Sequence, residues 1–337
     1  MKKSLFISIL LCANLLRISA SEPFVSRVFP ASSVRAVEAV TSGGSITVSG
    51  DADSEAVVEV YVSRDKWSAE KIKQTFEENY TLDIELKGGK LHVEARSKSR
   101  ISNWNQQGLN ISFKITVPRQ ANSNLRTSGG SIHISNMSGE QDFTTSGGSL
   151  KVENVSGKIN GRTSGGSITV ANSSDVIELK TSGGSISAKD CNGKIKLSTS
   201  GGSLNLSNLS GDIDASTSGG SVTAKNIHGA LKTGTSGGSV RLEGISGSVE
   251  ARSSGGAMNV TMESVSDYVR LTNSGNTSLT LPSGKGYQLN VKGNKVETSG
   301  LADFRGNMTG SSIDGATGSG GPEISIKTSQ RARLTFL

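Results

Sequence analysis

The chain has 337 residues, among them 42 glycines and two cysteines, and 4% of its residues are aromatic. Its 36 Lys and Arg residues outnumber its 29 Asp and Glu residues, which gives a formal charge of +7 at pH 7. Because the two signs are interleaved along the repeats described below, there is no continuous basic stripe, and we expect no nucleic-acid partner.

The first 20 residues have the three parts of a secretory signal peptide: the basic pair Lys2–Lys3, the mostly apolar Leu5–Leu16 and the small-residue end Ile18–Ala20. We expect cleavage after Ala20, which removes three basic residues and lowers the formal charge from +7 to +4. The apolar run is too short for a membrane span, and no later run of 18 apolar residues exists in the sequence. We therefore expect an exported protein in the periplasm, on the outer-membrane surface or in the extracellular medium, with no transmembrane segment after signal removal.

Residues 21–126 are predicted to form a β-rich capping region that contains one short helix. The helix is expected near residues 68–78, because Ser68 is a favourable N-cap and Ile72 and Phe76 share one face at i, i+4 spacing. Alternating apolar residues predict strands in four segments: Ala56–Ser63, Thr81–Leu86, Lys90–Ala95 and Asn110–Val117.

From residue 127 the tetrapeptide Thr-Ser-Gly-Gly recurs every 18 residues. Its copies begin at Thr127, Thr145, Thr163, Thr181, Thr199, Thr217 and Thr235, and at Ser253 with Ser in place of Thr. A lone copy precedes them at Thr41–Val48. A fixed period of this length predicts a stacked array in which each unit buries its apolar face against its neighbours. Eighteen residues are too few for a propeller blade or a helical pair, so each unit is predicted to be one coil of β-structure.

The columns of the repeat predict how each coil is built. With the threonine as position 1, positions 6 and 8 are apolar throughout, and positions 15 and 17 are mostly apolar, which predicts two short strands. Ser-Gly-Gly-Ser at positions 2–5 and Asn-x-Ser-Gly at positions 10–13 carry residues that tolerate positive φ or bond their own backbone, so both are predicted to be corners. Residues 127–260 are therefore predicted to be a regular parallel β-solenoid within an all-β fold. The alternative, antiparallel hairpins, would need a self-complementary register twice in every repeat.

After Met258 the period is lost, and residues 261–337 are predicted to be irregular C-terminal coils and a cap. The next partial copies of the repeat follow at longer intervals, at Asn273 and Thr298. The final segment, Glu323–Leu337, has two alternating strands that we expect to close this end of the array. Closure is needed because open sheet edges promote end-to-end aggregation.

These motifs resemble those of a known bacterial family. The resemblance is carried by Ile115–Pro118 at a strand end, by the Ser-Gly-Gly-Ser coils with Asn-x-Ser-Gly corners, and by the Gly-Gly-Pro segment that ends at Pro322. Over residues 30–337 the chain is similar to the putative-adhesin family of exported β-strand-repeat proteins of unknown function. The resemblance implies a secreted or envelope-facing β-solenoid, and its motifs specify corners and core but no chemistry.

The sequence offers no catalytic, cofactor-binding or metal-binding constellation, and we predict none of these sites. Its three histidines, His92, His133 and His228, have no second histidine or carboxylate at metal-ligand spacing. Cys191 falls in an apolar column and is predicted to be a buried hydrophobic residue without a disulfide partner. Polysaccharide-acting β-helices need acidic clusters on neighbouring coils, whereas the acidic residues of these repeats are separated by lysines.

Three functional hypotheses follow, in descending order. The first is a non-enzymatic structural or adhesin-like interaction module of the cell envelope or surface, whose partner is an unidentified protein or glycan. The second is a specific binder of an envelope or extracellular glycan, which would use the hydroxyl ladder that begins with Thr127 and Ser128. The third is a polysaccharide-acting β-helix enzyme.

Overall fold

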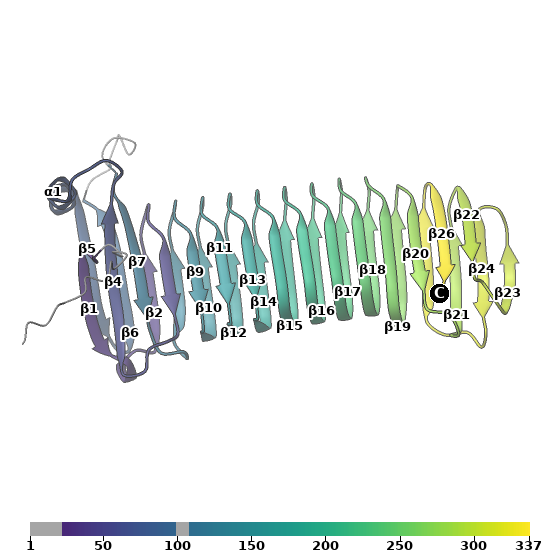
Figure 1. Cartoon of the computed structure of the whole chain (residues 1–337), viewed down its shortest axis with the longest axis horizontal. Coiled ribbons are helices and arrows are strands. Elements are labelled where there is room, and N and C mark those ends of the chain that lie inside the picture. Colours follow the sequence, from purple (N-terminus) through teal and green to yellow (C-terminus); the bar gives the residue numbers. More distant parts are fainter. Residues whose placement is uncertain (1–21, 99–107) are drawn as a thin grey trace, which may run out of the picture.

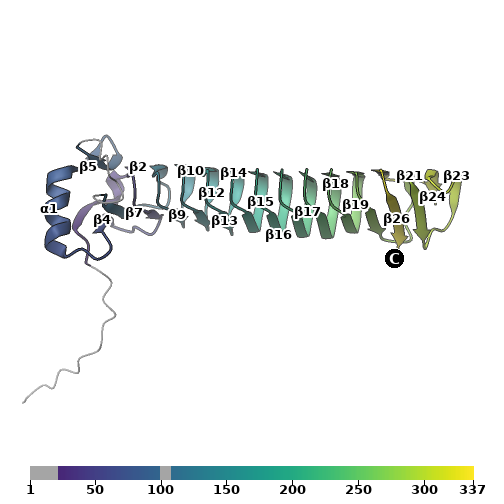
Figure 2. The ribbon, with the colours of Figure 1, turned by 90° about the horizontal axis from the view of Figure 1, so that it is seen from above.

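The computed structural model describes residues 22–98 and 108–337 of the chain (Figure 1). The signal peptide predicted for residues 1–20 lies outside the described residues. The described part is mostly β with one α-helix, and its sheet contains both parallel and antiparallel pairs. None of its helices is long and apolar enough to cross a membrane. Figures 1 and 2 show that the strands stack along one long axis into an elongated rod.

Each repeat of the central region contributes two strand segments, which join into one bent strand from β15 onward. These strands are β9 (Ile132–Ser135), β10 (Ser138–Thr144), β11 (Leu150–Glu153), β12 (Ser156–Arg162), β13 (Ile168–Ala171), β14 (Ser174–Lys180), β15 (Ile186–Thr199), β16 (Leu204–Thr217), β17 (Val222–Thr235), β18 (Val240–Ser253) and β19 (Met258–Asn273). Successive regular repeats pair in parallel with an 18-residue register, for example Leu150 with Ile168. Equivalent residues therefore stack on one another along the rod.

Burial follows the predicted columns. In one representative repeat, Ile168, Val170, Ile177 and Leu179 are at most 1% exposed, whereas Thr169 is exposed. Position 11 adds a further buried column, filled by Met137, Val155, Ser173, Cys191, Leu209, Ile227 and Ile245. The apolar side chains form one continuous core that successive coils share, so each coil is stabilised by burial against its neighbours.

The Asn corner, at positions 10–13, turns through left-handed residues as predicted. The position-10 residues with φ between 50° and 58° are Asn136, Asn154, Asn172, Asp190, Asn208 and Asn226. Asn and Asp tolerate this conformation better than other residues that carry a Cβ. Positive φ also occurs at the position-13 glycines Gly139, Gly157, Gly193, Gly211, Gly229 and Gly247.

The Ser-Gly-Gly-Ser segment is a corner between strands, as predicted, but it does not turn through positive φ. Among the described repeats, the glycines at positions 3 and 4 do not have left-handed φ values. Position 4 requires glycine for another reason, because a Cβ on Gly148 would lie 2.0 Å from the carbonyl oxygen of Gly130 in the preceding coil. Position 3 is less tightly constrained in most coils, since a Cβ would meet its nearest atom at 3.6 Å on Gly147 and at 3.1 Å on Gly237, although the distance shortens to 2.5 Å at Gly255. The position-4 glycine thus allows two backbones to approach closely.

The region before the repeats contains the predicted helix and strands. Its elements are β1 (Val25–Pro30), the 3-10 turn η1 (Ala31–Ser33), β2 (Ala36–Val40), β3 (Ile46–Ser49), β4 (Glu55–Ser63), α1 (Ala69–Asn79), β5 (Tyr80–Lys87), β6 (Lys90–Ser97), β7 (Asn110–Thr116) and β8 (Asn122–Arg126). Ser68 caps α1 by accepting a hydrogen bond from the Lys71 N–H at 3.3 Å. The helix lies at one end of the rod (Figure 2). Phe76 of the helix stacks on Tyr80.

The lone copy of the repeat at Thr41–Val48 is one coil of the stack. Its strands β2 and β3 pair in parallel with β8 and β9 on one side and with β6 and β7 on the other. The Thr127 hydroxyl donates to the Gly44 carbonyl at 2.8 Å, as later coils do to their own predecessors. Strands β4 to β7 therefore lie outside this coil, and β1, β4 and β5 add antiparallel pairs at this end.

The prediction that Glu323–Leu337 closes the far end is wrong. The region after β19 contains β20 (Thr277–Leu281), β21 (Tyr287–Lys292), β22 (Lys295–Ser299), β23 (Phe304–Met308), β24 (Ser312–Thr317), β25 (Glu323–Thr328) and β26 (Arg331–Phe336). β25 pairs with β19 and β21, and β26 pairs with β20 and β22, so the final strands lie inside the stack (Figure 1). The end is formed by β22 and by the antiparallel strands β23 and β24. Alternating apolar residues identify a strand with a buried face, but they do not reveal its place in the stack.

Candidate functional site

The threonine that opens each repeat is buried and bonded within the rod. The Thr181 hydroxyl donates to the Gly166 carbonyl of the preceding coil at 2.7 Å and accepts from the Gly184 N–H at 3.3 Å. The same donation to the preceding coil is made by Thr145, Thr163, Thr199, Thr217, Thr235 and Ser253. The hypothesis that these threonines form part of a glycan-binding hydroxyl ladder is therefore wrong. Their hydroxyls join neighbouring coils and do not face a ligand.

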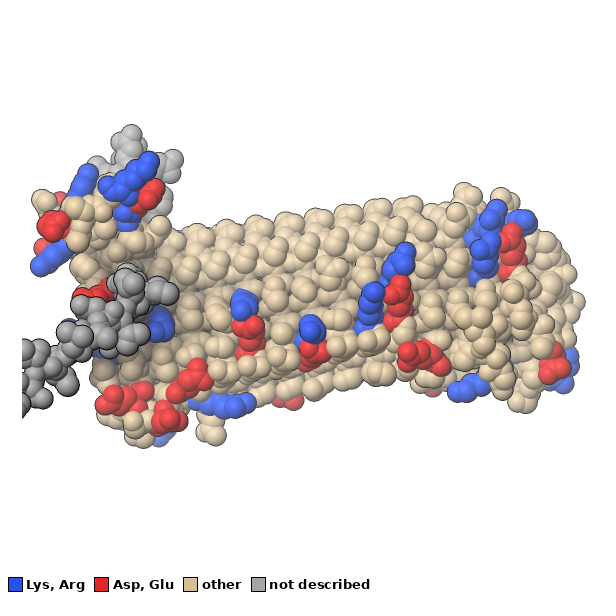
Figure 3. All heavy atoms as spheres, in the orientation of Figure 1, with Lys and Arg blue, Asp and Glu red and all other residues tan. Residues whose placement is uncertain are grey.

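The serines at position 5 bond to the next coil, whereas those at position 2 are exposed on the surface. At position 5 the Ser131 hydroxyl accepts from the backbone N–H of Ser149 in the next coil at 3.1 Å. The exposed serines at position 2 are Ser128, Ser146, Ser164, Ser182, Ser200, Ser218, Ser236 and Ser254. We call this row, with the glycines at position 3, the serine strip. Figure 3 shows a broad uncharged surface along the edge of the rod where Figure 1 places the loops between successive coils.

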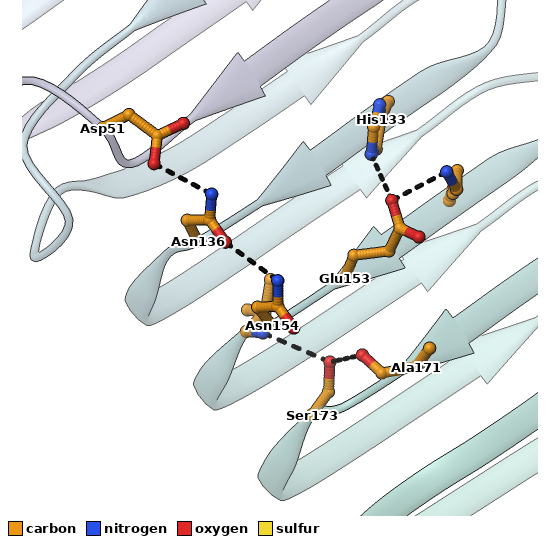
Figure 4. Close-up of polar contacts among 9 residues, drawn as sticks. Asp51, His133, Asn136, Glu153, Asn154, Ala171 and Ser173 are labelled. Atoms are coloured by element: carbon orange, nitrogen blue, oxygen red, sulfur yellow. Dashed lines mark hydrogen bonds and ion pairs between the residues drawn. The ribbon is translucent and has the colours of Figure 1, made fainter.

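The Asn corner carries a ladder of side-chain amides, which we call the asparagine ladder. Asn136 donates from Nδ2 to Asp51 Oδ1 at 2.8 Å, and Asn154 donates to Asn136 Oδ1 at 3.0 Å (Figure 4). Further along the rod, Asn226 donates in the same direction to Asn208 Oδ1 at 3.1 Å. In each of these pairs the amide donates toward the preceding coil, so its own oxygen is left to accept from the following coil.

Charged residues on one outer face alternate in sign from coil to coil. The position-16 column contains Glu178, Lys196, Asp214, Lys232, Glu250 and Arg270, which stand opposite one another on adjacent parallel strands. Opposite charges at such positions attract, whereas a register that placed like charges opposite one another would be destabilised. The result is a mixed surface, as expected from the sequence, and not a stripe of one sign.

His92 lies between two carboxylates that the sequence patterns did not bring together. Its Nδ1 lies 3.3 Å from Glu38 Oε2, and its Nε2 lies 3.2 Å from Glu94 Oε2. Hydrogen bonds from Lys90 to Glu38 and from Arg96 to Glu94 hold the pKa of both carboxyls below the usual value. Glu38 is distant in the sequence, and the pairing of β2 with β6 places it opposite His92. These five side chains form a network of hydrogen bonds and ion pairs.

The other two histidines lie in the repeats. His133 faces outward, with Nε2 3.0 Å from Glu153, and Lys151 also contacts this carboxylate at 2.7 Å (Figure 4). The hydrogen bond from Lys151 is the main cause that lowers the pKa of Glu153. His228 is exposed in the Asn corner. Within residues 22–98 and 108–337, no group of three or more His, Cys, Asp and Glu side chains is arranged to hold a metal ion.

Cys191 is a free, buried thiol, as predicted. Its Sγ lies 3.1 Å from the Lys189 carbonyl oxygen, to which it donates. Burial raises the pKa of the thiol, which reduces the thiolate fraction and therefore its reactivity. The residue occupies the position-11 column between Ser173 and Leu209.

A surface depression of about 400 Å³ interrupts the regular Asn corner. It is lined by Asn208, Leu209, Ser210, Asn226, His228 and Glu263, and we call it the corner dent. Five of the six lining residues are polar, and they carry amide, hydroxyl, imidazole and carboxylate groups. The corner dent therefore offers hydrogen-bonding groups of several kinds at one place on the rod.

Comparison with known proteins finds neither a matching family model nor a matching curated protein. Among solved structures, the chain is similar to a putative cell adhesion protein from Clostridium sporogenes, with 8% identity, a TM-score of 0.26, and coverage of 94% of this chain and 99% of that one. It is also similar to a putative adhesin from Bacteroides fragilis, with 12% identity, a TM-score of 0.26, and coverage of 93% and 96%. A putative lipid binding protein from Parabacteroides distasonis has 15% identity, a TM-score of 0.34, and coverage of 94% and 98%. Membership of the adhesin family stays a prediction, and the function proposed below rests on the chain's own residues.

Proposed function

We propose that the protein is a non-enzymatic, exported β-solenoid that serves as a structural or adhesin-like interaction module of the cell envelope or surface. Its partner would be an envelope or surface component, either protein or glycan. The observation that carries this proposal is that the polar groups of the repeat bond from coil to coil in the same way along the rod.

Three kinds of contact support the proposal. The position-1 hydroxyl bonds the preceding coil, the position-5 hydroxyl bonds the following coil, and the position-10 amide bonds the preceding coil, as seen at Thr181, Ser131 and Asn154. Catalysis needs polar groups that converge on a substrate. In this protein the polar groups of the repeat bond to neighbouring coils. They are therefore better explained as the groups that hold the rod together.

The serine strip is the surface that we propose for partner contact. It presents exposed hydroxyls from Ser128 to Ser254, one in each coil, at the strand spacing of about 4.8 Å. A partner bound along it would contact several coils at once. The total affinity would then grow with the number of coils engaged, as in other multivalent contacts.

Crosslinking in the native host tests this proposal. A photo-crosslinking residue is placed at Ser164, on the serine strip, and the matched control carries it at Thr169, exposed on the strand of the same coil. We expect the protein in the periplasm, outer-membrane or medium fraction, with a partner captured from Ser164 and not from Thr169. Recovery in the cytoplasm, or equal capture from both positions, would contradict the proposal.

A further inference from the structure

The asparagine ladder ends at Asn226. The Nδ2 of this residue donates to Asn208 Oδ1 at 3.1 Å, so its own Oδ1 is turned toward the next coil. There the ladder position is occupied by Gly244, with φ +66°, and glycine has no side-chain amide to donate. Among the described residues, no side chain continues the ladder beyond Asn226.

The following coil places a carboxylate beside this position. The pairing of β18 with β19 shifts register at the corner: Ile245 pairs with Met262, and the next residue, Ser246, pairs with Ser264. Glu263 is therefore an extra, unpaired residue of β19 at this point. Ser246 Oγ donates to Glu263 Oε2 at 3.2 Å. A Cβ on Gly244 would lie 2.9 Å from Asn226 Oδ1 and 3.3 Å from Glu263 Oε1. The two oxygens are therefore within about 6 Å of each other, which one donor group can bridge.

The charge of this arrangement selects a cationic donor. Both oxygens are acceptors, and the carboxylate carries a negative charge. The cations of the two preceding coils, Lys225 and Arg241, each contact Glu243 at 3.1 Å, and the described residues form no ion pair with Glu263. Hydrogen bonds from a cation to a carboxylate are stronger than those between neutral groups, so a protonated amine is the donor that fits best.

The rest of the lining indicates what carries the amine. Asn208, Ser210 and His228 offer amide, hydroxyl and imidazole groups, which suit neighbouring hydroxyls on a ligand. The volume of about 400 Å³ falls within the range of roughly 300–1,000 Å³ found for small-molecule sites. We propose that the corner dent binds a protonated amino sugar, with its ammonium group between Asn226 Oδ1 and Glu263. This inference goes beyond the proposed function, because it concerns one site that does not repeat along the rod.

Two substitutions separate the charge of the corner dent from its shape. Glu263→Gln removes the negative charge and keeps the length of the side chain. Gly244→Asn restores the ladder, because φ +66° is close to the +54° that Asn226 adopts, and the new amide would supply the donor and fill the dent. Thr169→Ala, on an exposed strand position outside both the serine strip and the corner dent, is the matched control.

The test is an NMR titration of the full chain with glucosamine up to about 50 mM, near pH 6, where the amine is protonated. We expect saturable shifts at Gly244 and His228, at least about tenfold weaker binding to Glu263→Gln, and none to Gly244→Asn. The Thr169→Ala control should bind as the unsubstituted protein does. N-acetylglucosamine, which keeps the ring and loses the charge, should bind at least about tenfold more weakly than glucosamine.

Four results would overturn the proposal. They are the absence of saturable shifts with glucosamine, equal binding of N-acetylglucosamine, unchanged binding by folded Gly244→Asn, and equal or tighter binding of lysine amide. The last would show that the dent recognises an amine without the sugar. Circular dichroism establishes that each variant is folded, and Glu263→Gln keeps the test decisive if Gly244→Asn does not fold.

Discussion

Replacing Gly148 with alanine should destabilise the rod far more than replacing its neighbour Gly147. A Cβ on Gly148 would lie 2.0 Å from the Gly130 carbonyl oxygen and 2.6 Å from the Ser131 nitrogen. Carbon and oxygen atoms in close C–H···O contacts normally lie about 3.3 Å apart. The two coils would therefore have to separate by roughly 1 Å at this corner.

The magnitude follows from the bonds that such a separation would break. Three of the hydrogen bonds that join the coils here lie closest to the clash: Gly147 N–H to the Ser128 carbonyl at 2.9 Å, the Thr145 hydroxyl to the Gly130 carbonyl at 2.8 Å, and Ser149 N–H to the Ser131 hydroxyl at 3.1 Å. At about 1 kcal/mol for each bond, Gly148→Ala should lower the free energy of unfolding by about 3 kcal/mol. A Cβ on Gly147 would meet its nearest atom at 3.6 Å, so Gly147→Ala should change the free energy of unfolding by less than about 0.5 kcal/mol.

Urea unfolding followed by far-ultraviolet circular dichroism compares the two variants. Thermal midpoints are measured alongside, because long repeat arrays can lose two-state behaviour. Equal midpoints for Gly148→Ala and Gly147→Ala would refute the reasoning, since the close approach of the backbones would then not require glycine at position 4.

Further tests come from the buried apolar core, from the buried threonines at position 1, and from the network of side chains around His92. Ile168→Asp should lower the free energy of unfolding by about 4 kcal/mol because it buries an unpaired carboxylate, while Thr169→Asp should change it by less than about 0.5 kcal/mol; thermal unfolding compares them. Thr181→Val removes the donor to Gly166 and should cost about 1 kcal/mol in urea unfolding, whereas Ser182→Ala should have no measurable effect. The folded-state pKa of Glu38 lies below 4.5, so its contribution to stability is present above pH 4.5 and is lost as the pH falls through the lowered value. Glu38→Gln should flatten the acid side of a plot of Tm against pH, and an unchanged slope would contradict this assignment.

The parts of the fold that repeat could be predicted, because equivalent residues stack when successive coils have the same length. The inward columns at Ile168 and Ile177 and the left-handed residues of the Asn corner followed from residue type and period. The reason for glycine at Gly148 could not be predicted in this way. A glycine that turns the chain and a glycine that makes room for a neighbouring backbone look alike in a sequence.

The order of strands at the two ends depends on contacts that no local pattern records. β2 pairs with β6 and β8, and β26 pairs with β20 and β22, across long stretches of intervening chain. The corner dent was missed for a similar reason. Gly244 is visible as a gap in the column of asparagines, but the position of Glu263 beside it depends on the register shift between β18 and β19.

Removal of whole coils tests most directly the central claim that function is distributed along the rod. Two coils are deleted, singly and together: Thr163–Lys180 and Thr181–Ser198. Each deletion rejoins equivalent positions of the 18-residue register and leaves the corner dent in place. Circular dichroism should show that the shortened rods are folded. Partner capture from a crosslinking residue at Ser128 should fall by a similar step for each coil removed. A complete loss of capture in one single deletion and little loss in the other, with both variants folded, would contradict the claim.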